Sequence, residues 1–254
     1  MGCDRIPVVQ IAQVQYINAA STGFAECSVG FREIRTMADS ALQRKNMVES
    51  QVRPSDVTDR RIMAAMQDIP RERFVPEGQK PLAYMDEEIP FGAGRGLLAP
   101  RIFARLVQLA NIGPDDKVLD VGCLTGYSTA VIVRLSGHVV ALESDAELAG
   151  TARNLFAAQE AKAAEVVTGA LAAGHAAAGP YDVIVVEGAT ERIPETLTSQ
   201  LAPGGRLVAI ETTSRRLSQA VIVTKSASGL TKRVAFEASG TLLPGFEKPA
   251  VFAF

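Results

Sequence analysis

The chain has few of the residues that cross-link small secreted proteins or build metal sites. It contains three cysteines and two histidines. The cysteines are odd in number and far apart, and no histidine cluster accompanies them, which excludes a disulfide framework and a zinc site. We therefore expect reduced thiols and no metal. Because no convincing export signal is present, we also expect a cytoplasmic protein.

Long apolar runs and a strong excess of one charge are also missing. No stretch approaches the roughly 18 apolar residues that a membrane span requires. The formal net charge of −2 gives no electrostatic reason to expect nucleic acid or an anionic membrane as a partner. We expect a globular protein that acts as a monomer on a partner of another kind.

The first 36 residues sustain neither a helical nor a strand periodicity. We interpret residues 1–36 as a poorly structured extension and Met37 as the biological start. The remainder, 37–254, is expected to form a single domain. Its first part, 37–110, is a helical cap region, and 111–254 is the ligand-binding core.

The cap region shows helical patterns interrupted by proline. A mostly polar helix is expected over Ala38–Val52. Asp56 or Thr58 is expected to cap a second helix, which stops at Pro70. The charged, proline-rich segment that follows should be irregular, and Pro100 stands in the first turn of a third, amphipathic helix.

From residue 111 onward, short apolar strands alternate with helices. Such alternation predicts an α/β fold with right-handed βαβ units and a mainly parallel seven-stranded sheet, preceded by the helical extension. The last strands follow one another without helices, which predicts an antiparallel edge. The expected strands are Lys117–Val121, His138–Leu142, Glu165–Thr168, Tyr181–Glu187, Arg206–Ile210, Ala220–Lys225, Lys232–Ala238 and Ala250–Phe254, and the expected helices are Tyr127–Ser136, Ala146–Ala158 and Ile193–Leu201.

The run Val118–Tyr127 reads Val-Leu-Asp-Val-Gly-Cys-Leu-Thr-Gly-Tyr and joins a strand to a helix. Gly122 lets the backbone approach a ligand, and Gly126 allows close packing at the start of the helix. Asp120 is placed to hold the ammonium of an amino-acid moiety. The Gly-x-Gly-x-x-Gly spacing of dinucleotide sites is absent. The alternative interpretation is an ordinary turn with a capping acid.

Glu143 supports a ligand at this turn. It ends the next strand, 23 residues after Asp120. An acid at that position faces the same crevice and can accept hydrogen bonds from both hydroxyls of a ribose. Together the two acids and Gly122 favour a nucleoside-type ligand.

With the turn Ala202-Pro203-Gly204-Gly205 before the fifth strand, these motifs resemble those of Rossmann-like class I S-adenosylmethionine-dependent methyltransferases. From about Met47 to Phe254 the chain is similar to one branch, the protein-L-isoaspartate O-methyltransferases. Beside the methyltransferase core, the resemblance includes Met47–Arg53, Ile69–Pro76, Leu82–Asp86, the loop from Pro90 to Pro100 and Leu243–Phe246. The N-terminal segments are its specific part, because many other methyltransferases share the core.

The resemblance implies S-adenosyl-L-methionine as cofactor and methyl transfer to an isoaspartyl carboxylate in a damaged protein or peptide, a repair reaction. It further implies a set of cofactor-binding residues. These are Asp120, Gly122, Cys123, Gly126, Tyr127, Glu143, Ser144 and Ala170.

The sequence departs from the family pattern at the substrate loop and at the cofactor turn. The family loop reads Gly-x-Gly-Gln-Thr-Ile-Ser-Gln-Pro, whereas this chain has Gly96 and Leu98 in place of the hydroxyl residues. Leu124 replaces a glycine of the cofactor turn. Thr168-Gly169-Ala170 stands where the family usually has Gly-Asp, so the acid expected near the adenine is missing. Two alternatives therefore stay open: a methyltransferase with a different acceptor, and a non-catalytic binding protein with the same fold.

Three charged residues are candidates for acceptor chemistry. Arg95 and Arg101 flank the substrate loop. Either both are solvated surface residues, or one binds a substrate carboxylate bidentately in place of the lost hydroxyls. Glu187, at the end of the fourth strand, is a candidate to orient the acceptor or to act as a base, or else it is only a capping or crevice acid.

Overall fold

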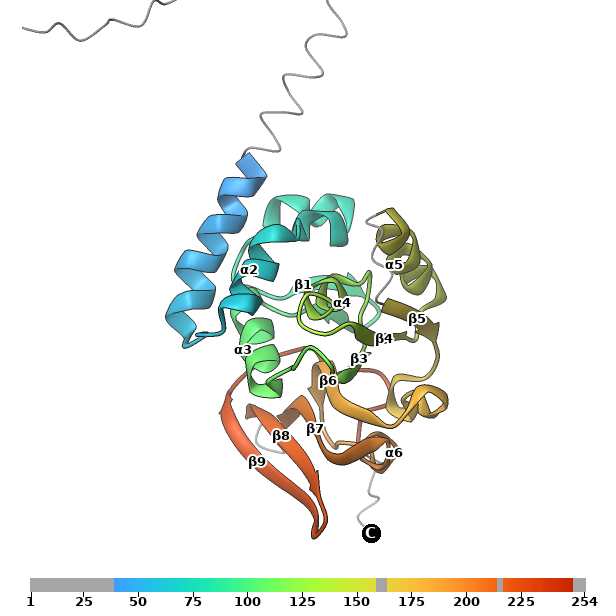
Figure 1. Ribbon diagram of the computed structural model, residues 1–254. Coiled ribbons are helices and arrows are strands. Elements are labelled where there is room, and N and C mark those ends of the chain that lie inside the picture. The colour runs from blue at the N-terminus through green and yellow to red at the C-terminus, as the bar shows by residue number, and fades with distance from the viewer. Residues whose placement is uncertain (1–38, 159–163, 214–216, 249–254) are drawn as a thin grey trace, which may run out of the picture. The chain divides into compact units, whose positions relative to one another are not determined.

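A mainly parallel sheet forms the centre of the computed structural model (Figure 1). The structure describes residues 39–158, 164–213 and 217–248, which belong to one unit, Asp39–Phe254. The predicted extension 1–36, the proposed start at Met37 and the predicted strand Ala250–Phe254 lie outside the described residues.

The main sheet has the strand order β5-β4-β3-β6-β7-β8-β9. The first five strands in this order pair in parallel and the last two pair antiparallel. The predicted fold class, including the antiparallel edge, is therefore confirmed. The strands are β3 Lys117–Val121, β4 His138–Glu143, β5 Ala164–Thr168, β6 Tyr181–Thr190, β7 Leu201–Thr212, β8 Ser218–Ser226 and β9 Gly229–Glu237.

The chain reverses its direction of travel across the sheet at β3. It continues from β3 to β4 and β5 on one side and then returns to form β6 on the other side. In the middle of β3, Leu119 is paired with Val140 of β4 and with Ile184 of β6. Ligands of open α/β sheets bind at the carboxyl ends of the strands at such a switch point.

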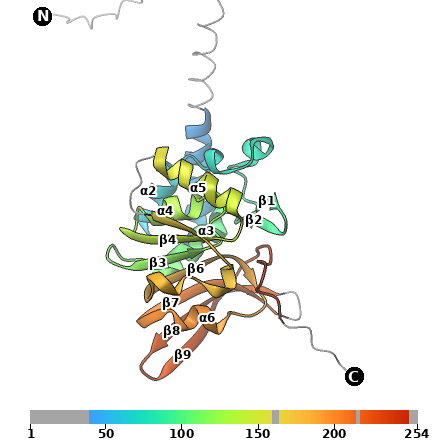
Figure 2. The same cartoon turned by 90° about the vertical axis from the view of Figure 1, so that its right-hand side faces the viewer.

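Helices and loops cover the sheet on both faces. Val118 of β3 belongs to one apolar cluster, and Leu119 and Val121 belong to the other, as the alternation of side chains along a strand requires. Figure 2 shows α2, α4 and α5 gathered at one end of this unit and the β8–β9 ribbon at the other. The helices are 39–47, α2 Arg60–Asp68, α3 Pro100–Ala110, α4 Tyr127–Ile132, α5 Ala146–Ala158 and α6 Glu195–Ser199.

The start of α2 corrects one sequence prediction. Asp59, and not Asp56 or Thr58, is the N-cap residue, because its side chain accepts a hydrogen bond from the Arg61 amide at 2.8 Å. Asp56 instead has a φ of 64° and ends the preceding 3-10 turn. Helix α4 is also shorter than expected and ends at Ile132.

A two-stranded hairpin lies ahead of α3, where the sequence indicated only a loop. Strand β1, Ile89–Gly92, pairs antiparallel with β2, Arg95–Leu97. Gly92, Ala93 and Gly94 all have positive φ values, between 48° and 81°, and form the tight turn. The hairpin is a separate small sheet, and the segment before it consists largely of 3-10 turns, as the irregular composition predicts.

The segment after β9 returns to the carboxyl end of β6. The amide of Ala189 donates to the Thr241 carbonyl at 2.8 Å, and the Leu243 amide donates to the Ala189 carbonyl at 2.9 Å. The Thr241 amide also donates to Glu88 Oε1 at 3.1 Å, next to the β1–β2 hairpin. None of the helices in the described ranges is long and apolar enough to cross a membrane.

Candidate active site

Three acidic side chains meet at the carboxyl ends of neighbouring strands. Asp120 lies in β3, Glu143 ends β4, and Glu187 lies in β6. All three are buried. Because a buried carboxylate is costly unless it is paired or hydrogen-bonded, the partners of each oxygen define what the crevice can hold.

One of the two carboxylate oxygens of Asp120 has hydrogen-bond partners among the described residues. Ser128 and Thr129, in the first turn of α4, donate hydroxyl hydrogen bonds of 2.7 Å and 2.5 Å to its Oδ2. Its Oδ1 is buried and has no partner among the described residues. Burial raises the pKa of Asp120 to about 6, against the lowering effect of the two hydroxyls.

Glu187 lies on the strand next to Asp120, one residue beyond the pair Val121–Val186. Its Oε1 is likewise buried, and no group in the described part of the chain bonds to it. Burial, and then the charge of Asp120, raise the pKa of the Glu187 carboxyl well above its usual range, while Arg71 acts in the opposite direction. The two acids therefore form an interacting pair.

The turn between β3 and α4 has a left-handed backbone at Gly122 and Leu124 and is tied to Glu143. Gly122 has a φ of 87°, and the Leu124 amide donates to Glu143 Oε2 at 2.8 Å. Leu124 itself has a φ of 54°, which is costly for a branched side chain. That side chain is 2% exposed and belongs to the apolar cluster that also holds Tyr127 and Phe156.

Glu143 binds an arginine from the hairpin. Arg95 donates from Nη1 to Glu143 Oε1 at 2.6 Å and from Nη2 to Oε2 at 2.9 Å. Arg95 Nη2 also donates to the Gly122 carbonyl at 3.1 Å, and Nη1 lies 3.3 Å from Ser144 Oγ. Burial raises the pKa of Glu143 but the Arg95 hydrogen bonds lower it, and the net direction is downward. Arg95 is thus a buried residue of the crevice.

The predicted residues divide into two groups. The structure brings Asp120, Gly122, Glu143, Ser144 and Arg95 together, with Glu187 beside Asp120. Others contribute backbone or packing. Cys123 is buried, and burial is the main cause that raises the pKa of its thiol. Gly126 is the N-cap of α4, and the ring of Tyr127 packs against Phe74 and Phe103. Ala170 is exposed and follows Gly169, whose amide donates to the Glu143 carbonyl.

Arg101 lies apart from the crevice. It forms an ion pair with Asp86 at 3.2 Å, and its side chain is 53% exposed. The interpretation of a solvated surface arginine therefore describes Arg101, whereas it does not describe Arg95.

Glu88 explains why the loop carries no side chain at Gly96. A Cβ atom on Gly96 would lie 2.1 Å from Glu88 Oε1, the atom that accepts the Thr241 amide. A threonine at position 96 would therefore displace Glu88. Leu98 is 1% exposed and packs in the core. The residues at both positions that lack the family hydroxyl are thus packed against their neighbours.

Arg71 is a buried residue of this region whose importance the sequence reasoning did not single out. It is fully buried and donates to the carbonyls of Ala83 and Leu98 at 2.9 Å and 2.7 Å. Its guanidinium lies 4.6 Å from the centre of the Tyr127 ring. The sequence of the segment Ile69–Pro76 offers no signal that sets Arg71 apart from Arg73, since both are arginines in the same short turn.

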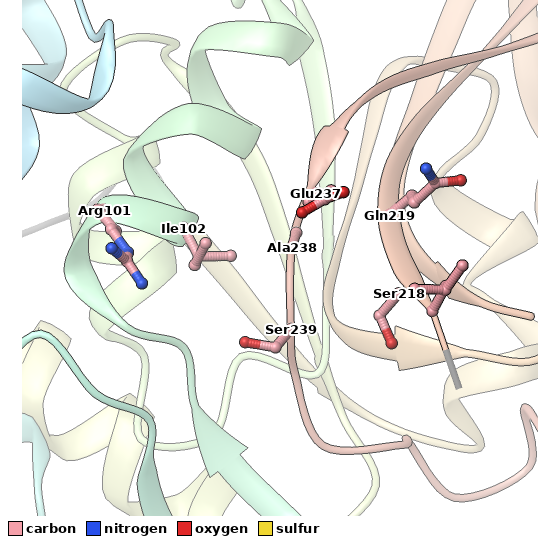
Figure 3. Close-up of a pocket in the computed structure, with 8 residues that line it drawn as sticks. Arg101, Ile102, Ser218, Gln219, Glu237, Ala238 and Ser239 are labelled. Atoms are coloured by element: carbon pink, nitrogen blue, oxygen red, sulfur yellow. The ribbon is translucent and has the colours of Figure 1, made fainter. Parts of the chain in front are cut away.

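An open groove lies beside the substrate loop (Figure 3). Its volume is about 390 Å³. Ser239, one of its lining residues, is followed by Gly240, where an added Cβ would lie 3.0 Å from Leu98. Leu98 therefore lies near this part of the lining. Its lining residues are Arg101, Ile102, Leu217, Ser218, Gln219, Glu237, Ala238 and Ser239.

Comparison with known proteins identifies the family of this chain. The profile of the family described as Protein-L-isoaspartate(D-aspartate) O-methyltransferase matches residues 42–237. A protein-L-isoaspartate O-methyltransferase of Koribacter versatilis is 40% identical over 75% of this chain and 85% of its own length. One of Methanoculleus marisnigri is 39% identical over 66% of this chain and 76% of its own length.

Solved structures support the fold. A protein-L-isoaspartate O-methyltransferase structure covers 80% of this chain and 66% of its own, with a TM-score of 0.69 and 23% identity. A Plasmodium falciparum structure described as a putative enzyme of the same name, in complex with S-adenosyl-L-homocysteine, covers 79% of this chain and 97% of its own, with a TM-score of 0.68 and 20% identity. The predicted resemblance is confirmed: the chain belongs to the protein-L-isoaspartate(D-aspartate) O-methyltransferase family.

Proposed function

We propose that this chain transfers a methyl group from S-adenosyl-L-methionine to the carboxylate of isoaspartyl residues in proteins or peptides. Membership of the family supports the reaction. The observation that carries the proposal is the pair of buried acids, Asp120 and Glu187, each with an unpartnered oxygen beside the Gly122 turn.

The residues of the crevice fit this cofactor. Asp120 offers a free carboxylate oxygen to an ammonium group, and Glu143 offers a carboxylate at the carboxyl end of β4 to the ribose hydroxyls. Gly122 adds no side chain to this space, into which the Arg95 guanidinium reaches. When bound, the cofactor supplies a methyl group on a sulfonium, which is already activated for displacement.

An acceptor carboxylate needs no general base, because its reference pKa is about 4 and it is ionised at neutral pH. The chain must therefore align the acceptor and exclude water. We assign Glu187 to alignment: with its raised pKa it keeps its proton to higher pH, and in that form it can donate a hydrogen bond to the acceptor. Arg95 can bind the acceptor carboxylate only after it leaves Glu143.

The groove beside Leu98 suits an extended acceptor, because it is open and its lining is largely polar at Ser218, Gln219 and Ser239. We propose that the isoaspartyl segment of a damaged protein lies there. Protein repair, action as a monomer and residence in the cytoplasm belong to the same proposal.

Methyl transfer to a matched peptide pair tests the function. The two peptides differ only in an isoaspartyl or an ordinary aspartyl residue, and transfer is followed with methyl-labelled S-adenosyl-L-methionine. We expect labelling of the isoaspartyl peptide with a kcat/KM on the order of a hundredfold higher, because the acceptor must be aligned. Equal labelling of both peptides, or none despite cofactor binding, contradicts the proposal.

Cofactor affinity should depend on pH through the acid pair. The pKa of Asp120 is raised to about 6, so the group is ionised above that pH and neutral below it. A neutral carboxyl no longer attracts an ammonium or sulfonium, so the Kd for S-adenosyl-L-methionine should rise by up to about tenfold per pH unit below pH 6. Because Asp120 and Glu187 interact, the midpoint belongs to the pair.

Calorimetric titrations between pH 5 and pH 8 measure this dependence. Asp120→Asn is the matched variant: it should bind more weakly at pH 7.5 and lose most of the change with pH. A wild-type Kd that stays constant over the whole range would show that the pair does not contact the cofactor.

A further inference from the structure

The Arg95 guanidinium lies where the cofactor ribose is expected. It binds both oxygens of Glu143, and a Cβ built on Gly122 would lie only 3.2 Å from its Nη2. The side chain of Arg95 in the ion pair is 5% exposed and that of Glu143 is fully buried. The hairpin therefore places a side chain inside the crevice that the β3–α4 turn and the end of β4 form.

The hydrogen bonds of Glu143 leave little capacity for a second ligand. Apart from Arg95, its Oε1 accepts from the amides of Ser144 and Asp145 at 2.7 Å and 3.0 Å and from the Ser144 hydroxyl at 3.2 Å, and its Oε2 accepts from the Leu124 amide. A carboxylate has about four lone-pair sites. These neighbouring donors and the two Arg95 bonds together exceed that number, so a ribose diol and this guanidinium cannot both bind there.

The hairpin that carries Arg95 is not part of the main sheet. Among the described residues its strands β1 and β2 pair with each other, the turn Gly92–Gly94 between them is exposed, and all three residues of β2 are buried. The Arg95 guanidinium is carried on a long unbranched side chain, and its Nε has no hydrogen-bond partner among the described residues. Release of the guanidinium therefore breaks contacts to Glu143, Gly122 and Ser144 without disturbing the main sheet.

We propose that Arg95 is an internal competitor of the cofactor, whose guanidinium must leave Glu143 before the ribose hydroxyls can bind. This inference rests on the proposed function, since it takes S-adenosyl-L-methionine as the ligand. Arg95 then sets the apparent affinity, because the intrinsic Kd is divided by the fraction of molecules in which Glu143 is free.

The variant Arg95→Gln tests the competition. Glutamine stands at this position in the family pattern, and it is too short and uncharged to form the bidentate pair. S-adenosyl-L-homocysteine is the probe, and calorimetry gives its Kd without any turnover. If Glu143 is free in about one molecule in ten, the variant should bind on the order of tenfold more tightly than the wild type.

Two further variants make the result specific. Arg95→Lys keeps the charge but loses the fork of donors, so its affinity should lie between those of the wild type and Arg95→Gln. Arg134→Gln removes an arginine that is 58% exposed and paired weakly with Asp68 at 4.0 Å, and should leave the Kd unchanged. This control accounts for the change in net charge.

The outcomes separate the competitor from the function. Tighter binding by Arg95→Gln, with the Arg134→Gln control unchanged, supports the proposal. Equal or weaker binding by Arg95→Gln overturns it but leaves the proposed methyl transfer intact. If neither the wild type nor Arg95→Gln binds the probe, both the competitor and the proposed cofactor are wrong.

Discussion

Replacing Glu143 with alanine is expected to abolish measurable binding of S-adenosyl-L-homocysteine and to lower the free energy of unfolding by about 3–5 kcal/mol. The binding loss follows from the proposed contact with the ribose. The stability loss follows because Arg95 would remain as a buried charge without its partner, and because the amides of Leu124, Ser144 and Asp145 would lose their acceptor. Urea unfolding and calorimetry measure the two effects.

The double variant Arg95→Gln/Glu143→Ala separates these effects. Removing the orphaned charge should restore part of the stability, so the two substitutions should not be additive. Cofactor binding should stay lost, since the acceptor for the ribose is gone. Recovery of binding in the double variant would contradict the role of Glu143, and additive stability losses would contradict the energetic importance of the ion pair.

Replacing Arg71 with leucine is expected to lower the free energy of unfolding by roughly 2–6 kcal/mol, from two buried carbonyls that each cost about 1–3 kcal/mol when unpaired. Those carbonyls belong to Ala83 and Leu98. The second of them anchors the loop beside the groove. We therefore also expect a higher KM for an isoaspartyl peptide, measured in the methyl-transfer assay.

Arg73 provides the matched control, since it is exposed two residues further along the same 3-10 turn. Arg73→Leu should change stability by no more than about 0.5 kcal/mol. Arg71→Lys keeps the charge but cannot bridge both carbonyls, so it should recover only part of the loss. Equal stability of Arg71→Leu and wild type would show that water satisfies the two carbonyls.

Much of the sheet could be predicted because its strands are short, buried and apolar. Strand β3 has the predicted bounds, and β4 and β5 differ from prediction by one residue. The positions of Asp120 and Glu143 followed from the same reasoning, since parallel strands bring their carboxyl ends to one edge. The family resemblance of the cap region is confirmed as well.

The direction of long side chains could not be predicted. Arg95 and Glu143 are 48 residues apart, and nothing local indicates that the arginine folds inward. Tyr127 was expected to face the cofactor, but it begins α4 and packs against Phe74 and Phe103, far away in the sequence. Such choices depend on which partners the tertiary structure brings near.

Local hydrogen bonding explains the other differences. Asp59 caps α2 although two nearby residues are equally good capping types, because its backbone is extended immediately before the helix and its side chain accepts from the Arg61 amide. The hairpin was missed because β1 contains Pro90 and β2 has three residues, too few for a strand pattern.

The contacts of Thr241 and Leu243 have a consequence for the order in which the structure can form during synthesis of the chain. Leu243 packs against Gly188 and lies near Gly122, and Thr241 holds Glu88 from the first half of the chain. During synthesis β3, β4 and β6 leave the ribosome before these residues do. The contacts that Leu243 makes near Gly122 and that Thr241 makes with Glu88 can therefore form only after the central strands have been synthesised.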